Sequence, residues 1–218
     1  MRFDEVERRL AEAALTHHLP GPEAQSSMAP RPRRLWVPGV VPETARKAAG
    51  LALLYPRGGD TALLLTVRGE HLHTHRGQVS LPGGAVEADE SIESAALREA
   101  EEEIGLDPAV VAIRLVLTPL HIPVSSYVLY QVVATTASSP NVRPCAREVE
   151  RIVEIELSRM AGGSGLGVQM SVRDGVPTQG PYFDVGGAKL WGATAMVVAE
   201  LLAVLHAPVD PWKASARP

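Results

Sequence analysis

The segment from Gly84 to Leu106 constrains this chain most, because it concentrates negative charge on a sequence with strong helix signals. It contains eight acidic residues and one arginine, whereas the whole chain of 218 residues has a net charge of only −4. Ser91 and the acids before it supply a capping group and negative charge for a helix start, and Gly105 is suited to end the helix. We therefore predict a helix over residues 91–104.

Helical geometry separates the acids of this segment from its apolar side chains. At about 100° per residue, three glutamates fall within one arc of about 100°, namely Glu99, Glu102 and Glu103. The apolar positions occupy another arc about 120° away, which we expect to face the core: Ala96, Leu97, Ala100 and Ile104. Like charges at this spacing destabilise a helix, and a hard divalent cation would reverse that penalty. Periodicity alone leaves a solvated acidic face open as the alternative.

The overall composition is that of an ordinary globular protein. Hydrophobic residues make up 45% and charged residues 21% of the chain, which is long enough for one well-buried domain. The single cysteine, Cys145, excludes an internal disulfide and is expected to be a structural thiol. The apolar run 193–205 contains Glu200 and is too short to span a bilayer. With its small net charge, the chain is expected to be cytoplasmic, without a nucleic-acid or membrane partner.

Short strand patterns lie on both sides of the predicted helix. We expect strands at residues 50–55, 61–67, 78–81, 110–117, 127–136 and 151–155. Two further strands, 168–173 and 176–183, predict a hairpin across the Asp174-Gly175 turn. A second long helix, rich in Ala, Leu and Val, is expected over 192–205. Short strands around two separated helices indicate an α/β sandwich.

The beginning of the chain differs from the rest. Residues 3–18 indicate an amphipathic helix, and residues 20–34 are rich in Pro, Gly and Ser, which predicts a linker or extended arm. We therefore expect an N-terminal helix and arm over 1–48, a compact domain over 49–206 and a tail over 207–218. Packing of the arm on its own domain and packing on a partner subunit of a homodimer both remain open.

The spacing of residues within the acidic segment is specific. It runs Gly84, five residues, Glu90, seven residues, Arg98-Glu99, Ala100, one residue, Glu102-Glu103, one residue, Gly105 and Leu106. This pattern resembles the Nudix box at every fixed position. Its seven exact matches would coincide about once in 10⁸ windows at average residue frequencies. The resemblance implies a Nudix-type α/β/α sandwich with a mixed sheet between helices, and a Mg²⁺-dependent hydrolase of a phosphate–phosphate bond.

The resemblance also implies roles for individual residues. The implied metal ligands are the carboxylates of Glu99, Glu102 and Glu103, with the backbone carbonyl of Gly83 as an addition. Mg²⁺, for which Mn²⁺ could substitute, would neutralise the pyrophosphate, polarise a phosphorus centre and lower the pKa of an attacking water.

The other box residues divide into a structural group and a candidate base. The structural group implied by the resemblance is Gly84, Glu90, Arg98 and Gly105, in which the charge-assisted contact of Glu90 with Arg98 ties the loop to the helix. Glu102 is the first choice for the base that takes the proton from water. Glu148 and Glu150 are candidates from outside the box.

A second motif directly precedes the box. It reads Leu64-Leu65-Thr66-Val67-Arg68, then a His-rich loop, then Gly77 and finally Leu81-Pro82-Gly83-Gly84. This resembles the signature of the coenzyme A pyrophosphatase branch of Nudix hydrolases, and residues 190–195 resemble the start of that branch's last helix. The implied reaction converts coenzyme A or acyl-CoA into a 4′-phosphopantetheine compound and adenosine 3′,5′-bisphosphate.

A binder of coenzyme A needs positive groups beside the acidic site, because this substrate carries a pyrophosphate and a 3′-phosphate. The candidate substrate-binding residues are Arg68, His73, His75, Arg76 and Gln78. Three positions depart from the signature. Gly69 is found where the signature has Ser or Ala, His73 where it has Arg, and Leu81 where it has Phe. A neutral imidazole at position 73 lacks the permanent, forked cation of arginine.

These departures leave other functions open. Gly69 and His73 favour another nucleoside diphosphate derivative as substrate, such as ADP-ribose or a dinucleoside polyphosphate. A catalytically silent domain that binds a nucleotide or a protein is a further alternative, although the chain keeps all three acids of the box. The histidines at 71, 73 and 75 could also be solvated loop residues or a zinc or nickel site.

Overall fold

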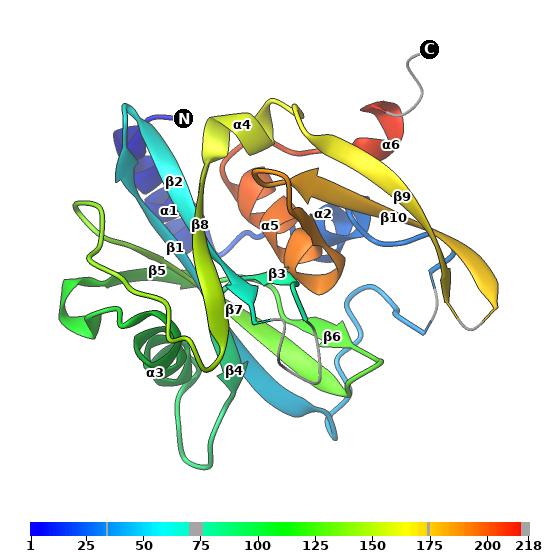
Figure 1. Ribbon diagram of the computed structural model, residues 1–218, viewed down its shortest axis with the longest axis horizontal. Coiled ribbons are helices and arrows are strands. Elements are labelled where there is room, and N and C mark those ends of the chain that lie inside the picture. Colours follow the sequence, from blue (N-terminus) through cyan, green and yellow to red (C-terminus); the bar gives the residue numbers. More distant parts are fainter. Residues whose placement is uncertain (34, 70–75, 174, 215–218) are drawn as a thin grey trace.

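The computed structural model describes residues 1–33, 35–69, 76–173 and 175–214. Its centre is a mixed sheet in which β1 (Arg46–Arg57) is flanked by two long neighbours (Figure 1). β1 pairs antiparallel with β2 (Asp60–Arg68) and parallel with β7 (Tyr127–Thr135). The middle of β1 is buried on both faces, which explains its continuous apolar run.

Shorter strands complete the sheet around these three. They are β3 (Val79–Ser80), β4 (Gly83–Ala85), β5 (Ala112–Val116), β6 (Leu120–Ile122) and β8 (Val149–Glu156). β3 and β8 pair with β2, β4 pairs with β1, and β5 and β6 pair with β7. β4 and β6, each only three residues long, were not predicted because such short segments carry no periodic pattern.

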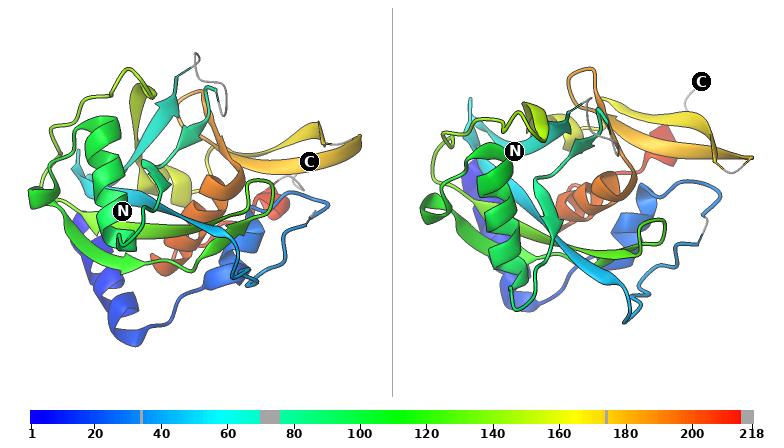
Figure 2. Two further views of the ribbon diagram at one scale, coloured as in Figure 1. Left: turned by 90° about the horizontal axis from the view of Figure 1, so that it is seen from below. Right: turned by 60° about the horizontal axis from the view of Figure 1, so that its bottom comes forward.

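Helices cover both faces of this sheet, as Figure 2 shows. α3 (Ile92–Ile104) packs on one face, where alternate β1 residues such as Leu51 and Leu53 join its apolar stripe. The opposite face holds a larger core cluster with α1 (Phe3–Thr16), α4 (Leu157–Ala161) and α5 (Gly192–Val204). The predicted α/β/α sandwich with a mixed sheet between helices is therefore confirmed.

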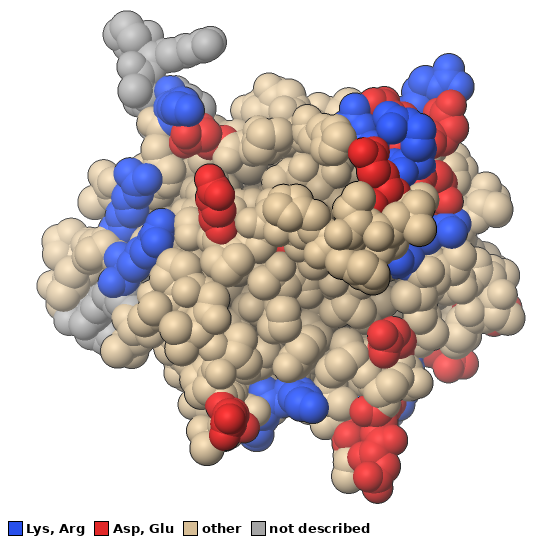
Figure 3. All heavy atoms as spheres, turned by 180° about the vertical axis from the view of Figure 1, so that it is seen from behind, with Lys and Arg blue, Asp and Glu red and all other residues tan. Residues whose placement is uncertain are grey.

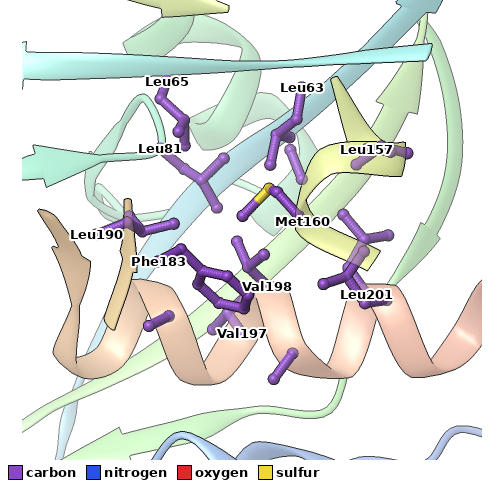
Figure 4. Close-up of a cluster of buried hydrophobic side chains, with 14 of the residues drawn as sticks. Leu63, Leu65, Leu81, Leu157, Met160, Phe183, Leu190, Val197, Val198 and Leu201 are labelled. Atoms are coloured by element: carbon purple, nitrogen blue, oxygen red, sulfur yellow. The ribbon is translucent and has the colours of Figure 1, made fainter. Parts of the chain in front are cut away.

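The larger cluster also attaches a second, three-stranded sheet to the domain. This sheet consists of β9 (Leu166–Arg173), β10 (Val176–Asp184) and β11 (Lys189–Trp191). Phe183 and Leu190 lie between α5 and Leu81, which directly follows β3 of the main sheet (Figure 4). The β9–β10 hairpin has the predicted pairing and projects from the body of the molecule (Figure 2).

The linker predicted for residues 20–34 is partly wrong, because it contains α2 (Gly21–Ser27). Pro22 and Glu23 in its first turn suit a helix start, and the helix packs against α5. A short 3-10 helix (Pro108–Val110) likewise replaces the start of the strand predicted at 110–117. The N-terminal segment packs on its own domain, with Val6 and Leu10 fully buried.

In the described ranges, no helix is long and apolar enough to cross a membrane. On the face seen from behind, acidic and basic side chains are interspersed and lie mainly towards the rim (Figure 3). A last short helix, α6 (Pro211–Ala214), is attached through Trp212, whose Nε1 donates to the carbonyl of Ser27 at 3.0 Å.

A buried glutamate fastens α2 to the rest of the domain. Glu200 of α5 is inaccessible to solvent, and its carboxylate accepts from Gln25 Nε2 at 2.8 Å and from the Thr118 N–H at 3.1 Å. Burial raises the pKa of Glu200, and the hydrogen bonds from Thr118 and Gln25 oppose that rise. Three segments far apart in sequence therefore depend on one carboxylate.

Replacing Glu200 with alanine should destabilise the domain. The Thr118 N–H and the Gln25 amide would lose their acceptor and a cavity would form in the core, so we expect the free energy of unfolding in urea to fall by about 3 kcal/mol. The control is Glu12→Ala on α1, where the side chain is 55% exposed. Equal losses in the two variants would show that the buried network contributes nothing.

Candidate active site

The acidic segment folds as its sequence predicts. α3 begins after Ser91, whose Oγ accepts the N–H of Ser94 at 3.1 Å. It ends at Gly105, which adopts the left-handed conformation with φ 63°. β4 lies directly before the loop that leads into α3 and pairs with β1, so the whole box is anchored on the central strand of the sheet.

Arg98 connects this loop to the helix. Its Nε and Nη2 donate to the two oxygens of Glu90 at 2.9 and 3.1 Å, and Nη2 also donates to the carbonyl of Ala85 at 3.1 Å. The hydrogen bond from Arg98 holds the pKa of Glu90 below its ordinary value. Glu90 also accepts the N–H of Glu87 at 3.1 Å. The structure thus brings together Glu90 and Arg98 as a tie across the loop.

The three glutamates of the predicted metal face differ in exposure. The side chains of Glu99, Glu102 and Glu103 are 15%, 61% and 5% exposed. Arg98 Nη1 donates to Glu99 at 2.9 Å and to Glu102 at 3.5 Å. The carboxylate of Glu103 is therefore buried, whereas that of Glu102 is largely exposed to water.

Two glycines allow the loop to approach the helix and the sheet closely. A side chain at Gly84 would come within 2.4 Å of Glu99 Oε1, and one at Gly83 within 2.4 Å of the carbonyl oxygen of Ala49. Any larger residue at Gly84 would therefore displace the carboxylate of Glu99. Glycine at position 84 therefore leaves room for an acid that the sequence predicts as a metal ligand.

Glu103 is the most perturbed acid of the site. Burial raises its pKa to about 7, the positive charge of Arg68 opposes that rise, and the negative charges of Glu99 and Glu148 add to it. Arg68 Nη1 lies 3.8 Å from Glu103 Oε1, while Glu103 Oε2 is buried and has no hydrogen-bond partner among the described residues. Burial likewise raises the pKa of Glu99.

Glu148 joins the site from the loop before β8. Its charge acts on both Glu99 and Glu103, raising their pKa values. The loop is held against the end of α3, because the N–H of Cys145 donates to the carbonyl of Glu103 at 2.8 Å. The sequence named Glu148 only as a candidate outside the box, since nothing in its local pattern indicates that it comes close to α3.

The site offers carboxylate oxygens as donors for a metal ion. Among the described residues, no three His, Cys, Asp or Glu side chains form a group that could hold a metal ion. The donor set nevertheless fits a hard divalent cation: Glu103 Oε2 is buried without a partner, and the like charges of Glu99 and Glu148 raise its pKa. Only oxygen donors are involved, as Mg²⁺ prefers.

The predicted substrate residues are only partly described. His73 and His75 lie outside the described residues, as does His71. On either side of these residues, the N–H of Arg68 donates to the carbonyl of Gln78 at 3.0 Å, and the N–H of Gly77 donates to the carbonyl of Arg68 at 3.1 Å. Arg76, next to Gly77, is exposed. Residues 77 and 78 therefore lie beside Arg68, which is itself 3.8 Å from Glu103.

The raised pKa of Glu103 predicts a pH-dependent stability in the presence of a metal chelator. The folded state favours the protonated acid, so this group's contribution is present below about pH 4.5 and is lost as the pH rises through about 7. We expect the free energy of unfolding of Glu103→Gln to exceed that of the wild type by about 2 kcal/mol at pH 8.5, and this difference to disappear at pH 5. A difference that stays constant across this range would contradict the assignment.

The comparisons with known proteins agree with this geometry. The sequence model of the NUDIX domain matches residues 44–159. The Nudix hydrolase NudL of Enterobacter sp. (strain 638) is 34% identical over 163 residues, which cover 72% of this chain and 81% of the relative. NudL of Escherichia coli O139:H28 (strain E24377A / ETEC) is 40% identical over 111 residues, covering 50% of this chain and 57% of the relative.

A solved structure shares the fold at low sequence identity. It is the bifunctional NMN adenylyltransferase/ADP ribose pyrophosphatase of Francisella tularensis, with a TM-score of 0.52 and 16% identity. The superposition covers 76% of this chain and 42% of that one. Together with the box at Gly84–Leu106, the matching domain and the relatives show that the chain belongs to the Nudix family.

Proposed function

We propose that this Nudix hydrolase cleaves the diphosphate bond of coenzyme A or acyl-CoA, with Mg²⁺ as its cofactor. The products would be 4′-phosphopantetheine, or its acyl form, and adenosine 3′,5′-bisphosphate. The observation that carries the proposal is the contact between the two sequence motifs: Arg68 of the coenzyme A signature lies 3.8 Å from Glu103 of the box. The residues that would select the substrate therefore adjoin those that would act on it.

The carboxylates of Glu99, Glu102 and Glu103 would hold the metal, with the Gly83 carbonyl as an addition. When bound, Mg²⁺ neutralises the pyrophosphate and lowers the pKa of an attacking water. Arg98 keeps the loop closed on the helix through Glu90, so that the ligand set is positioned before the substrate arrives.

The proton of the attacking water needs an acceptor. Glu102 is the most exposed acid of the three and accepts a long contact from Arg98 at 3.5 Å, so it can turn towards a water molecule. Glu148 is the second candidate, because its charge is felt at Glu99 and Glu103. A general base must come within hydrogen-bond reach of the water, and both groups border the same site.

The phosphates of the substrate would meet the loop that begins at Arg68. Gln78 pairs with Arg68 through its backbone carbonyl, Arg76 is exposed nearby in sequence, and His73 and His75 stand between Arg68 and Arg76 in the sequence. A cationic loop beside an acidic metal site suits a substrate that carries a pyrophosphate and a separate 3′-phosphate. The same arrangement would serve another nucleoside diphosphate derivative, and Gly69 and His73 favour that second candidate.

Replacing Glu102 with glutamine tests the proposed chemistry. We expect kcat to fall by at least about 100-fold, because the variant loses a metal ligand or the base. Glu101→Gln is the matched control, since it removes the same charge from the adjacent, exposed position of α3. Equal activity in the two variants would remove Glu102 from the mechanism.

A substrate panel tests the proposed specificity. Purified protein with Mg²⁺ is incubated with coenzyme A, an acyl-CoA, ADP-ribose and a dinucleoside polyphosphate, and the products are identified by mass spectrometry. We expect the highest kcat/KM for a coenzyme A compound, with adenosine 3′,5′-bisphosphate as a product. A preference for ADP-ribose would support the second candidate, and no turnover of any diphosphate would favour a silent binding domain.

A further inference from the structure

Arg68 is the last residue of β2. Alternate residues of this strand face α3, because Ala62 and Leu64 belong to the core cluster under that helix. Arg68 continues this alternation, so its guanidinium lies on the α3 side of the sheet, where Glu103 lies.

The pair formed by Arg68 and Glu103 is enclosed but loosely joined. The two side chains are 25% and 5% exposed, and their nearest charged atoms are 3.8 Å apart, which is too long for a hydrogen bond. Arg68 Nε and Glu103 Oε2 are both buried, and neither has a hydrogen-bond partner among the described residues. The two side chains are therefore close enough to attract each other, while Arg68 Nε can still donate a hydrogen bond and Glu103 Oε2 can still accept one.

We propose that Arg68 is the resident counter-ion of Glu103, which a divalent cation displaces when the site is loaded. This inference rests on the proposed metal-dependent function and assigns Arg68 a role towards the metal in addition to the substrate. If Arg68 were joined to Glu103 by short, paired hydrogen bonds, a metal ion could not easily replace it. A pair held by charge alone leaves Glu103 free to bind a metal.

The displaced guanidinium would then be available to the substrate. A cation bound by Glu103 repels Arg68, whose backbone is fixed at the base of the loop by Gln78 and Gly77. A phosphate of the substrate offers the nearest compensating negative charge. Metal binding would therefore favour substrate binding, and by linkage the substrate would favour the metal to the same degree.

The test is the binding of Mn²⁺ to the full chain without substrate, measured by electron paramagnetic resonance of the free ion. Arg68→Gln removes the competing charge, so we expect it to bind Mn²⁺ about ten-fold more tightly than the wild type. Arg68→Lys keeps the charge and should stay within about two-fold of the wild type. The control Arg57→Gln removes a β1 cation that pairs with Glu154, and should leave Mn²⁺ binding unchanged.

Two further measurements distinguish direct competition at Glu103 from an indirect effect of the Arg68 substitution. The tightening caused by Arg68→Gln should shrink by more than half in a Glu103→Gln background, because the charges act on one another directly. Arg68→Met, which keeps the apolar stem, gives the same test if the glutamine variant does not fold. Unchanged or weaker Mn²⁺ binding in both neutral variants would overturn the inference and leave the proposed function standing, whereas no Mn²⁺ binding by the wild type would overturn both.

Discussion

The repulsion among carboxylates on one face of α3 is the constraint on which the rest of the site depends. Glu99, Glu102 and Glu103 lie within about one turn of helix, and among the described residues the positive charges of Arg98, Arg68 and Arg147 offset theirs. Arg98 does so from within the box while also holding the loop through Glu90. The same charges that destabilise an isolated helix are the reason that we propose a divalent cation at this face.

The sheet supplies what the helix alone lacks. β2 delivers Arg68 from one strand end, and the loop before β8 delivers Glu148, so residues 80 positions apart in sequence act on the same carboxylate. Because β8 pairs with β2, these two contributions arrive from adjacent strands. The acids of the box are close together in the sequence. The charges that act on them, those of Arg68 and Glu148, come from distant segments that the fold brings together.

This division explains how much of the structure the sequence predicts. The caps of α3 and the β9–β10 hairpin follow from local signals and appear as predicted. α2 was missed because its short polar sequence is helical only through its packing on α5 and the bond between Gln25 and Glu200.

The candidate site shows the same limit. Helical periodicity places the three glutamates on one face, but their exposures of 15%, 61% and 5% depend on where the sheet and the loop before β8 cover that face. Alternation along β2 places Arg68 on the same side of the sheet as α3, but its closeness to Glu103 depends on how α3 packs on that side, for which the sequence carries no signal.

If the proposed function is correct, the carboxylates of α3 direct water to a diphosphate with the help of a divalent metal ion. Hydrolysis of coenzyme A in ¹⁸O-enriched water, followed by ³¹P NMR, shows where the water oxygen goes. We expect one ¹⁸O atom per turnover in one of the two phosphomonoester products, and only when Mg²⁺ or Mn²⁺ is present. Cleavage that proceeds equally well with a chelator, or products without the label, would rule out this mechanism.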